Sequence, residues 1–112
     1  MSHDPALTNP DLYTVLFEND RVRVLRYQDR PGDATSPHSH PDSVMITLAS
    51  FTRLLTANGR QVEVKLEPGQ ARWLDAQEHA GKNIGDTDSH AIFVELKEPP
   101  PSSPTAAALG PA

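Results

Sequence analysis

The feature that most constrains the fold is a long β-favouring stretch that ends in an Asn-Gly pair. Residues 44–57 read V-M-I-T-L-A-S-F-T-R-L-L-T-A, and Asn58-Gly59 then leads into R-Q-V-E-V-K-L. Asn-Gly between two such runs predicts a tight β-hairpin, because both turn positions need a positive φ. The first run is longer than an ordinary strand, so we predict a bend or bulge near Ala49-Ser50. In the returning strand we expect Val62, Val64 and Leu66 to face inward, and Gln61, Glu63 and Lys65 to face water.

Similar short runs lie on both sides of this hairpin. Asn19-Asp20 separates two β-patterned runs, residues 12–18 and 21–27, and residues 70–74 form a further short run. Strands punctuated by Gly, Pro and Asn-Gly turns, without a convincing amphipathic helix, predict an all-β sandwich or barrel.

The last run, residues 90–97, alternates apolar and charged side chains. We expect Glu95 and Lys97 to mark the wet face, and the opposite face to carry His90, Ile92, Val94 and Leu96. The composition changes at both ends of the chain. We therefore predict a flexible leader over residues 1–11, one barrel domain over residues 12–97, and a disordered Pro/Ala-rich tail over residues 98–112.

Composition excludes several classes of function. The chain has 112 residues, enough for one hydrophobic core, and a net charge of −5 without a Lys/Arg cluster. This charge argues against nucleic acid or an anionic membrane as a partner. The chain has no cysteine, which excludes disulfides and thiolate metal ligands. No apolar run approaches the roughly 20 residues of a membrane span, and the N-terminus does not resemble a signal peptide, so we expect a cytoplasmic protein.

A pair of histidines precedes the long β-favouring stretch. His38 and His40 flank Ser39, and prolines stand on either side of the three residues. Side chains two apart in an extended chain point to the same face, so the two imidazoles would aim at one point. Two imidazoles held in this way supply half of a divalent-metal site, although a solvated loop pair is the alternative interpretation.

The spacing around these histidines resembles the cupin motifs. Gly32 with His38 and His40 is similar to the start of the first motif, G-x5-H-x-H-x(3,4)-E-x6-G. Residues 69–83, with Gly69, His79 and Asn83, are similar to the second motif, G-x5-P-x-G-x2-H-x3-N. The resemblance covers residues 15–97. It implies a cupin-type jelly-roll barrel (a double-stranded β-helix), often a homodimer, with one divalent metal ion held by three histidines, His38, His40 and His79.

The chain departs from the first motif at the glutamate ligand. The glutamate position falls on Val44 or Met45, which are not metal ligands, and Asp42 or Glu78 could each be a substitute ligand or an ordinary surface carboxylate. Three neutral imidazoles leave the full +2 charge on the ion and leave two or three coordination positions open. The ion could be Fe, Zn, Ni or Mn. A three-histidine cupin centre looks like those of thiol and diketone dioxygenases, and it would also suit Lewis-acid chemistry.

Two hypotheses of function follow. The first is a small-molecule metalloenzyme of oxygenase or isomerase type, and the second is a non-catalytic cupin module that binds or senses a ligand. His90 is either a cavity-lining residue that carries a proton in catalysis or a hydrogen-bonded edge histidine. We expect the cavity to be lined by Val44, Met45, Trp73 and Asn83, with plain core packing as the alternative for Trp73. Arg26 or Arg53 could hold an anionic substrate.

Overall fold

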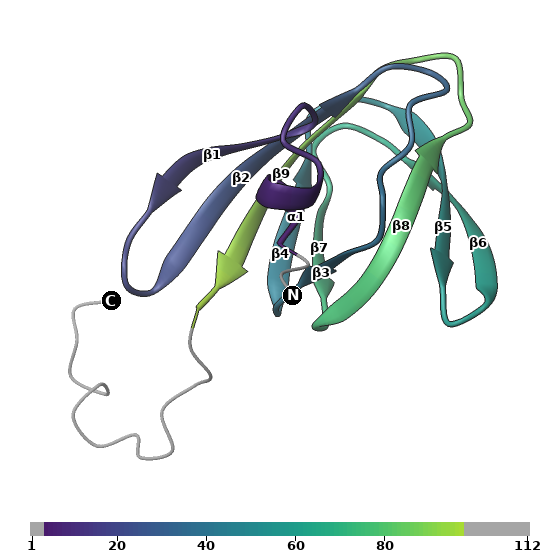
Figure 1. Ribbon diagram of the computed structural model, residues 1–112. Helices are drawn as coiled ribbons and strands as arrows, with labels where there is room; N and C mark the ends of the chain where they lie inside the picture. Colours follow the sequence, from purple (N-terminus) through teal and green to yellow (C-terminus); the bar gives the residue numbers. More distant parts are fainter. Residues whose placement is uncertain (1–3, 98–112) are drawn as a thin grey trace.

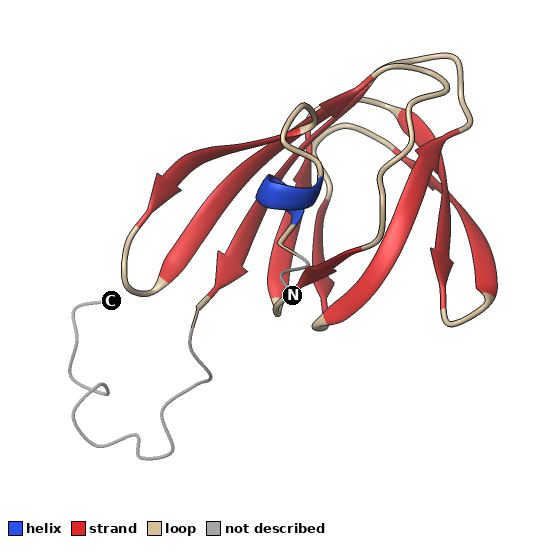
Figure 2. Ribbon diagram, viewed as in Figure 1, coloured by secondary structure: helices blue, strands red, loops and turns tan. Residues whose placement is uncertain are grey.

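The computed structural model describes residues 4–97, which form an all-β domain with one short helix, α1 (Pro5–Thr8) (Figures 1 and 2). One antiparallel sheet has the strand order β1 (Tyr13–Glu18), β2 (Val22–Asp29), β9 (Ser89–Leu96), β4 (Ser43–Thr47) and β7 (Ala71–Leu74). The second sheet has the order β3 (His38–His40), β8 (Gln77–Asn83), β5 (Phe51–Ala57) and β6 (Arg60–Leu66).

The two sheets form a jelly-roll barrel in which consecutive strands often belong to different sheets. Strands β4 and β5 are separated by three residues and lie in opposite sheets, which confirms the break predicted near Ala49-Ser50. Strand β2 pairs with β9 from Val22 opposite Leu96 to Asp29 opposite Ser89. This pairing joins the beginning and the end of the domain, and it places the last strand in the centre of the larger sheet (Figure 1).

The hydrophobic core lies between the two sheets. Its buried members are Tyr13, Leu25, Tyr27, Met45, Phe51, Leu66, Ala91 and Phe93. Tyr13 and Tyr27 stand opposite each other on β1 and β2, with ring centroids 4.7 Å apart. Aromatic rings bury large apolar areas, and a buried side chain of this kind stabilises a fold by about 1.5–3 kcal/mol. Several of these core side chains also line the cavity described below.

The β5–β6 hairpin forms at the predicted Asn-Gly turn, with φ of 53° at Asn58 and 74° at Gly59. The predicted inward face is correct for Leu66, which is buried, and partly correct for Val64. It is wrong for Val62, whose side chain is 58% exposed. Strand β6 is the edge of its sheet, and burial decreases along it toward the turn, so nothing covers its first half.

The predicted faces of β9 are inverted in the structure. Its buried side chains are Ser89, Ala91, Phe93 and Glu95, and the half-buried ones on the outer face are His90, Ile92, Val94 and Leu96. Glu95, predicted to face water, is 2% exposed. The sequence pattern therefore predicts the alternation of β9 correctly and the buried side wrongly, because both faces of the strand carry apolar residues.

The part of the predicted leader that the structure describes, residues 4–11, is folded against the barrel. Asp4 caps helix α1 by accepting a hydrogen bond from the backbone N–H of Ala6 at 2.9 Å, and it also forms an ion pair with Arg23 at 2.8 Å. The sequence predicts a flexible leader here, whereas the structure shows a segment held by these contacts. The predicted tail over residues 98–112 lies outside the described residues.

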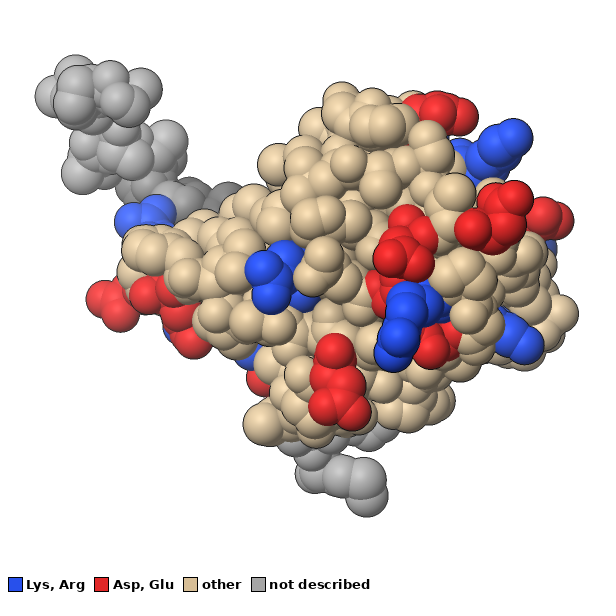
Figure 3. Space-filling model, turned by 90° about the horizontal axis from the view of Figure 1, so that it is seen from above, with Lys and Arg blue, Asp and Glu red and all other residues tan. Residues whose placement is uncertain are grey.

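Acidic and basic side chains are interspersed on the face drawn in Figure 3, without a large basic patch. Among residues 4–97, no helix has the length and apolar character needed to cross a membrane.

Candidate metal centre

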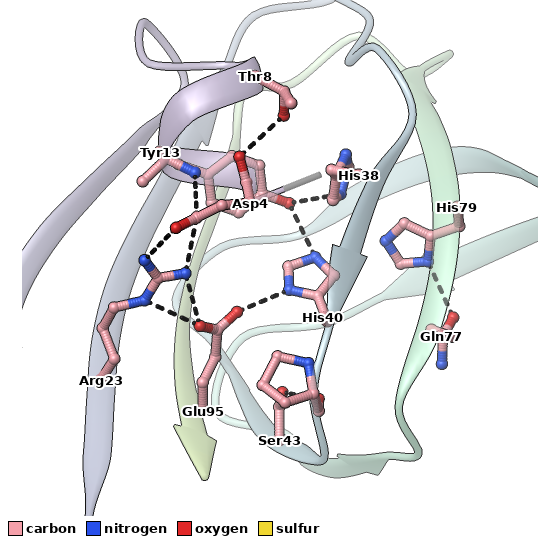
Figure 4. A network of polar contacts seen from close by, with 12 residues as sticks. Asp4, Thr8, Tyr13, Arg23, His38, His40, Ser43, Gln77, His79 and Glu95 are labelled. Carbon is pink, nitrogen blue, oxygen red and sulfur yellow. Dashed lines mark hydrogen bonds and ion pairs between the residues drawn. The ribbon is translucent and has the colours of Figure 1, made fainter. Parts of the chain in front are cut away.

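Three histidines from two distant segments converge inside the barrel. Strand β3 pairs with β8 so that His38 lies opposite His79, and His40 follows two positions along β3 on the same face. The ring centroids are 4.8 Å apart for His38 and His40, 4.9 Å for His38 and His79, and 5.1 Å for His40 and His79. Each ring offers one nitrogen within 4.8 Å of the others. The structure therefore brings together all three histidines singled out from the sequence (Figure 4).

Each of the three rings is held by a hydrogen bond at its Nδ1 atom. The Nδ1 of His38 donates to the backbone carbonyl of Ser36 at 2.8 Å, and that of His40 donates to Glu95 Oε2 at 3.0 Å. The Nδ1 of His79 donates to Gln77 Oε1 at 2.8 Å. Because these partners are oxygen acceptors, the proton of each neutral ring resides on Nδ1 and the lone pair on Nε2. Three metal-binding lone pairs are thus available on the other side of the rings.

Burial keeps two of these imidazoles neutral. Removal from water lowers the pKa of His38 to about 4 and that of His79 to about 3, since the protonated ring is disfavoured away from solvent. A neutral imidazole is the form that binds a metal ion. The site is therefore ready to accept a cation at neutral pH.

A chain of charged groups fixes the third ring. Glu95 accepts from His40 through one oxygen, and its other oxygen accepts from Arg23 at 2.8 Å (Figure 4). Arg23 also binds Asp4, and this hydrogen bond lowers the pKa of the Asp4 carboxyl. The buried carboxylate is thereby neutralised by a guanidinium, which lowers the cost of keeping it out of water. The sequence does not indicate that Glu95 belongs to the site, because a charged residue that alternates with apolar ones predicts a solvated face.

A tyrosine hydroxyl also lies among the imidazoles. Tyr13 Oη is 3.3 Å from Nε2 of His38 and 3.4 Å from Nε2 of His40. Burial raises the pKa of Tyr13, so its phenol stays protonated and can donate a hydrogen bond into the site. The sequence does not indicate that Tyr13 belongs to the site, since an isolated Tyr in a β-patterned run is typical of ordinary core packing.

The donor set fits one divalent ion. An ion at about 2.0–2.1 Å from each imidazole nitrogen can join nitrogens up to about 4.2 Å apart. The three nitrogens lie within 4.8 Å of one another, so small rotations of the rings bring them within reach. Of the ions expected from the sequence, Fe, Zn and Ni suit imidazole ligands, whereas Mn prefers oxygen ligands that this group lacks.

A mostly apolar cavity of about 170 Å³ adjoins the histidines. His38, His79 and Tyr13 lie in its wall, and its other lining residues are Tyr27, Met45, Phe51, Arg53, Leu55, Val64, Leu66, Arg72, Leu74, Gln77, Gly81, Ala91 and Phe93. No carboxylate belongs to this lining. The cavity can therefore hold a small organic molecule beside the three imidazoles.

Of the four side chains predicted to line the cavity, only Met45 does so. Val44 and Trp73 stand opposite each other on the outer face of the larger sheet, where Trp73 is 53% exposed and its Nε1 donates to Asp75 at 2.8 Å. Asn83 is fully buried, but it lies outside the cavity wall and donates to Asp29 at 3.0 Å and to the Thr87 carbonyl at 2.8 Å. These positions correct the predictions for Val44, Trp73 and Asn83.

The candidate proton carrier and the substitute ligands also lie away from the site. His90 is half-buried on the outer face of β9, opposite Gln28, because its neighbour Ala91 occupies the inner face. Asp42 accepts a hydrogen bond from the backbone N–H of Ala76 at 2.9 Å, as a turn residue does. Glu78 is exposed and lies beside Ser39, on the face of β8 opposite to His79. Neither carboxylate joins the three-histidine group.

Neither of the two arginines predicted as possible substrate anchors has a guanidinium available to a ligand in the cavity. Arg26 lies on the outer face, opposite Ile92. Arg53 reaches the cavity, but its Nη1 donates to the buried carboxylate of Asp29 at 2.7 Å and to Ser89 Oγ at 3.3 Å. Its guanidinium lies over the Tyr27 ring at 4.8 Å from the centroid. The charge of Arg53 is therefore committed to the interior of the protein.

Comparison with known proteins supports the fold. No protein-family model matches the chain, and no curated protein matches it. Among solved structures, a cupin domain from Bordetella pertussis matches with a TM-score of 0.73 and 28% identity, over 78% of this chain and 93% of that one. A predicted oxalate decarboxylase from Thermotoga maritima matches with a TM-score of 0.54 and 22% identity, over 75% of this chain and 78% of that one. A polyketide cyclase from Streptomyces resistomycificus matches with a TM-score of 0.56 and 23% identity, over 80% of this chain and 66% of that one.

Proposed function

Because this chain is a small cupin domain, we propose that it is a metalloenzyme acting on a small organic molecule, with one divalent ion held by His38, His40 and His79. The observation that carries this proposal is the set of three imidazoles whose Nδ1 atoms are all anchored, so that three Nε2 lone pairs are available in one buried place. A bound ion would supply Lewis-acid polarisation or, as iron(II), oxygen chemistry.

The cavity favours an oxygenase-type reaction over an isomerase-type reaction. An isomerase that moves a proton needs a base beside its substrate. The cavity lining contains no carboxylate and no histidine besides His38 and His79, which belong to the proposed ligand set. Tyr13 and Tyr27 have raised pKa values through burial, so they are neutral donors rather than bases. The chain itself would therefore position the substrate, exclude water and donate a hydrogen bond from Tyr13.

Metal analysis tests the site directly. We expect the protein purified without added metal to contain close to one divalent ion per chain, measured by elemental mass spectrometry. His38→Ala and His79→Ala should each lose this metal, since two imidazoles alone bind far more weakly. His90→Ala is the matched control and should keep it, because His90 lies on the outer face. Equal metal contents in all four proteins would contradict the proposal.

Oxygen uptake then tests the reaction class. The iron(II)-loaded protein should consume dioxygen with at least one member of a panel of small thiols, diketones and carboxylic acids, and His79→Ala should not. A metal-loaded parent that is silent across the panel would contradict the oxygenase proposal.

One contact favours a second candidate, a ligand-binding module without catalysis. The Tyr13 hydroxyl lies within hydrogen-bond distance of two Nε2 atoms, so it can donate its single proton to one of these rings when no ion is bound. Substoichiometric metal in the parent, together with tight binding of a small molecule by the metal-free protein, would support this candidate.

We also propose a second copy of the chain as a partner. An apolar row crosses the outer face of the larger sheet in register, through Phe17, Val24, Val94, Val44 and Trp73. Phe17 and Trp73 are each 53% exposed. A flat apolar row on a sheet suits the same row of a second copy related by a two-fold axis.

Light scattering on a sizing column tests this interface. The parent should have twice the mass of one chain, and Val94→Asp should have the mass of one chain. Val62→Asp is the matched control, because Val62 is equally apolar and 58% exposed but lies on the other sheet. A monomeric parent would contradict the interface. With a net charge of −5 and interspersed surface charges, we expect neither nucleic acid nor a membrane as a partner, and a cytoplasmic location stays a prediction.

A further inference from the structure

The fully charged side chains of the cavity wall are all basic. Its lining contains two arginines, Arg53 and Arg72, and no carboxylate. Most of the remaining wall is aliphatic or aromatic, including Met45, Phe51 and Leu55. A cationic group at the edge of an apolar space attracts an anion, and an apolar body can fill the rest of the space.

Arg53 does not have its charge available for a ligand. Its guanidinium is bound by Asp29 and Ser89, as described above, and only 12% of its side chain is exposed. Gly81 makes room for it, because a Cβ at this position would lie 2.4 Å from Arg53 Nη2. Arg53 is therefore a built-in part of the wall.

Arg72 differs from Arg53 in each of these respects. It lies on β7, the edge strand of the larger sheet, directly opposite Met45, and it is exposed. Within residues 4–97, it has no side-chain hydrogen bond or ion pair, whereas Arg23 and Lys97 each have a carboxylate partner. An arginine that lines a cavity with an unpaired guanidinium can form a bidentate contact with an incoming carboxylate.

We propose that Arg72 anchors the carboxylate of a small monocarboxylic acid, whose apolar body fills the cavity beside His38 and His79. This inference rests on the proposed function, because it names the substrate class of the same site. The volume of about 170 Å³ restricts the ligand to a few carbon atoms, which is well below the size of a drug-like molecule. One available guanidinium matches one carboxylate, and the apolar wall disfavours a second charge inside.

The experiment compares short-chain monocarboxylic acids with their neutral amides. Propionate, isobutyrate, isovalerate and 4-methylvalerate, and the four matching amides, are titrated into the metal-free and the zinc-loaded protein by calorimetry. Backbone amide NMR shifts of Gly81 and Leu55 report whether the probe enters the cavity, since both residues line it. Arg72→Gln removes the charge. Arg72→Lys keeps the charge but lacks the two parallel N–H donors of a guanidinium. Arg26→Gln is the matched control, because it removes the same charge from the outer face.

We expect at least one acid to bind the parent on the order of 10-fold more tightly than its amide, because a hydrogen bond to a charged group is involved. Arg72→Gln should abolish this preference, Arg72→Lys should retain part of it, and Arg26→Gln should retain it fully. The proposal is overturned if no acid is preferred over its amide, or if the preference survives Arg72→Gln, or if Arg26→Gln reduces it equally.

Failure of this inference can be distinguished from failure of the proposed function. If the protein holds a metal through its histidines but shows no preference for acids, only the assignment to Arg72 fails. If the protein holds no metal but its metal-free form prefers acids through Arg72, the metalloenzyme proposal fails and the carboxylate site remains.

Discussion

A half-buried strand usually has apolar side chains on its inner face and polar ones on its outer face. The two faces of strand β9 depart from this rule. The inner face carries two polar groups, Ser89 and Glu95, whereas the outer face carries one, His90, beside Ile92, Val94 and Leu96. The inner polar groups contact the site and its supports, since Glu95 binds His40 and Ser89 binds both Arg53 and Asp29. In this strand, the buried polar residues support the candidate site, and the apolar outer residues belong to the interface proposed above.

The inner polar groups are tolerated because each has partners. Among the described residues, no buried side-chain nitrogen or oxygen lacks a hydrogen bond. A buried carboxylate without a partner would cost several kcal/mol, so Glu95 depends on Arg23 and His40. The outer face has no such requirement, because water can reach its edges.

The largest difference in unfolding free energy between inner-face and outer-face variants is expected when an aromatic core residue is truncated. Phe93 is 7% exposed and stacks on the His40 ring with centroids 5.0 Å apart. Phe93→Ala should lower the free energy of unfolding by about 3–4 kcal/mol through the cavity that it leaves. Val94→Ala, one position away on the outer face, should cost about 1 kcal/mol or less. Urea unfolding measures both, and equal losses would contradict the assignment of faces.

Glu95→Ala should have the next largest effect on stability and a direct effect on metal binding. It leaves Arg23 with Asp4 alone and frees the Nδ1 of His40, so we expect a loss of about 2 kcal/mol in unfolding free energy. The metal affinity should fall about 10–100-fold, as expected when the support of a ligand is removed. Leu96→Ala is the control on the outer face and should leave the metal affinity unchanged. Competition with a chelator measures the affinities; an unchanged affinity in Glu95→Ala would contradict the role assigned to Glu95.

Acid should destabilise the metal-free protein between about pH 6.5 and pH 4. The pKa values of His38 and His79 are about 4 and about 3 in the folded protein, against an ordinary value of 6.5. In this range the unfolded chain binds more protons than the folded one, so the free energy of unfolding falls as the pH falls. The contribution is complete above about pH 6.5 and is lost progressively toward the folded pKa values.

Urea titrations at pH 7.5 and pH 5 measure this acid effect. The double variant His38→Gln, His79→Gln should depend less on pH across the same range, because the two titrating rings are absent. The carboxyls of Asp4 and Asp29 have lowered pKa values and act at lower pH, so they do not account for a loss in this window. A parent and a double variant with the same pH dependence would contradict the burial of neutral rings.

The smallest effect is expected at His90. It is half-buried on the outer face, so His90→Gln should change the free energy of unfolding by less than about 0.5 kcal/mol. Oxygen uptake and metal content should also stay at the parental level. A large loss of activity in this variant would restore His90 as a candidate proton carrier.

Local features of the chain were predictable from the sequence. The Asn58-Gly59 hairpin, the Asn19-Asp20 turn and the break between β4 and β5 follow from backbone preferences that act over a few residues. The alternation of His38 and His40 follows from the geometry of a strand. His79 was added by the spacing of the second motif, and the structure places it opposite His38.

Other features depended on contacts between distant segments. A period of two separates the faces of β9 but does not say which face is inside, and both faces of this strand carry apolar residues. Glu95 and Tyr13 join the site only because the sheet that contains β9 and β1 packs against β3 of the other sheet. Trp73 lies outside because β7 follows the register of β4. The sequence by itself determined the turns, the strands and the three histidines. The tertiary structure alone decided which side of each strand faces the three-histidine group, because sheet register and packing arise from residues far apart in the chain.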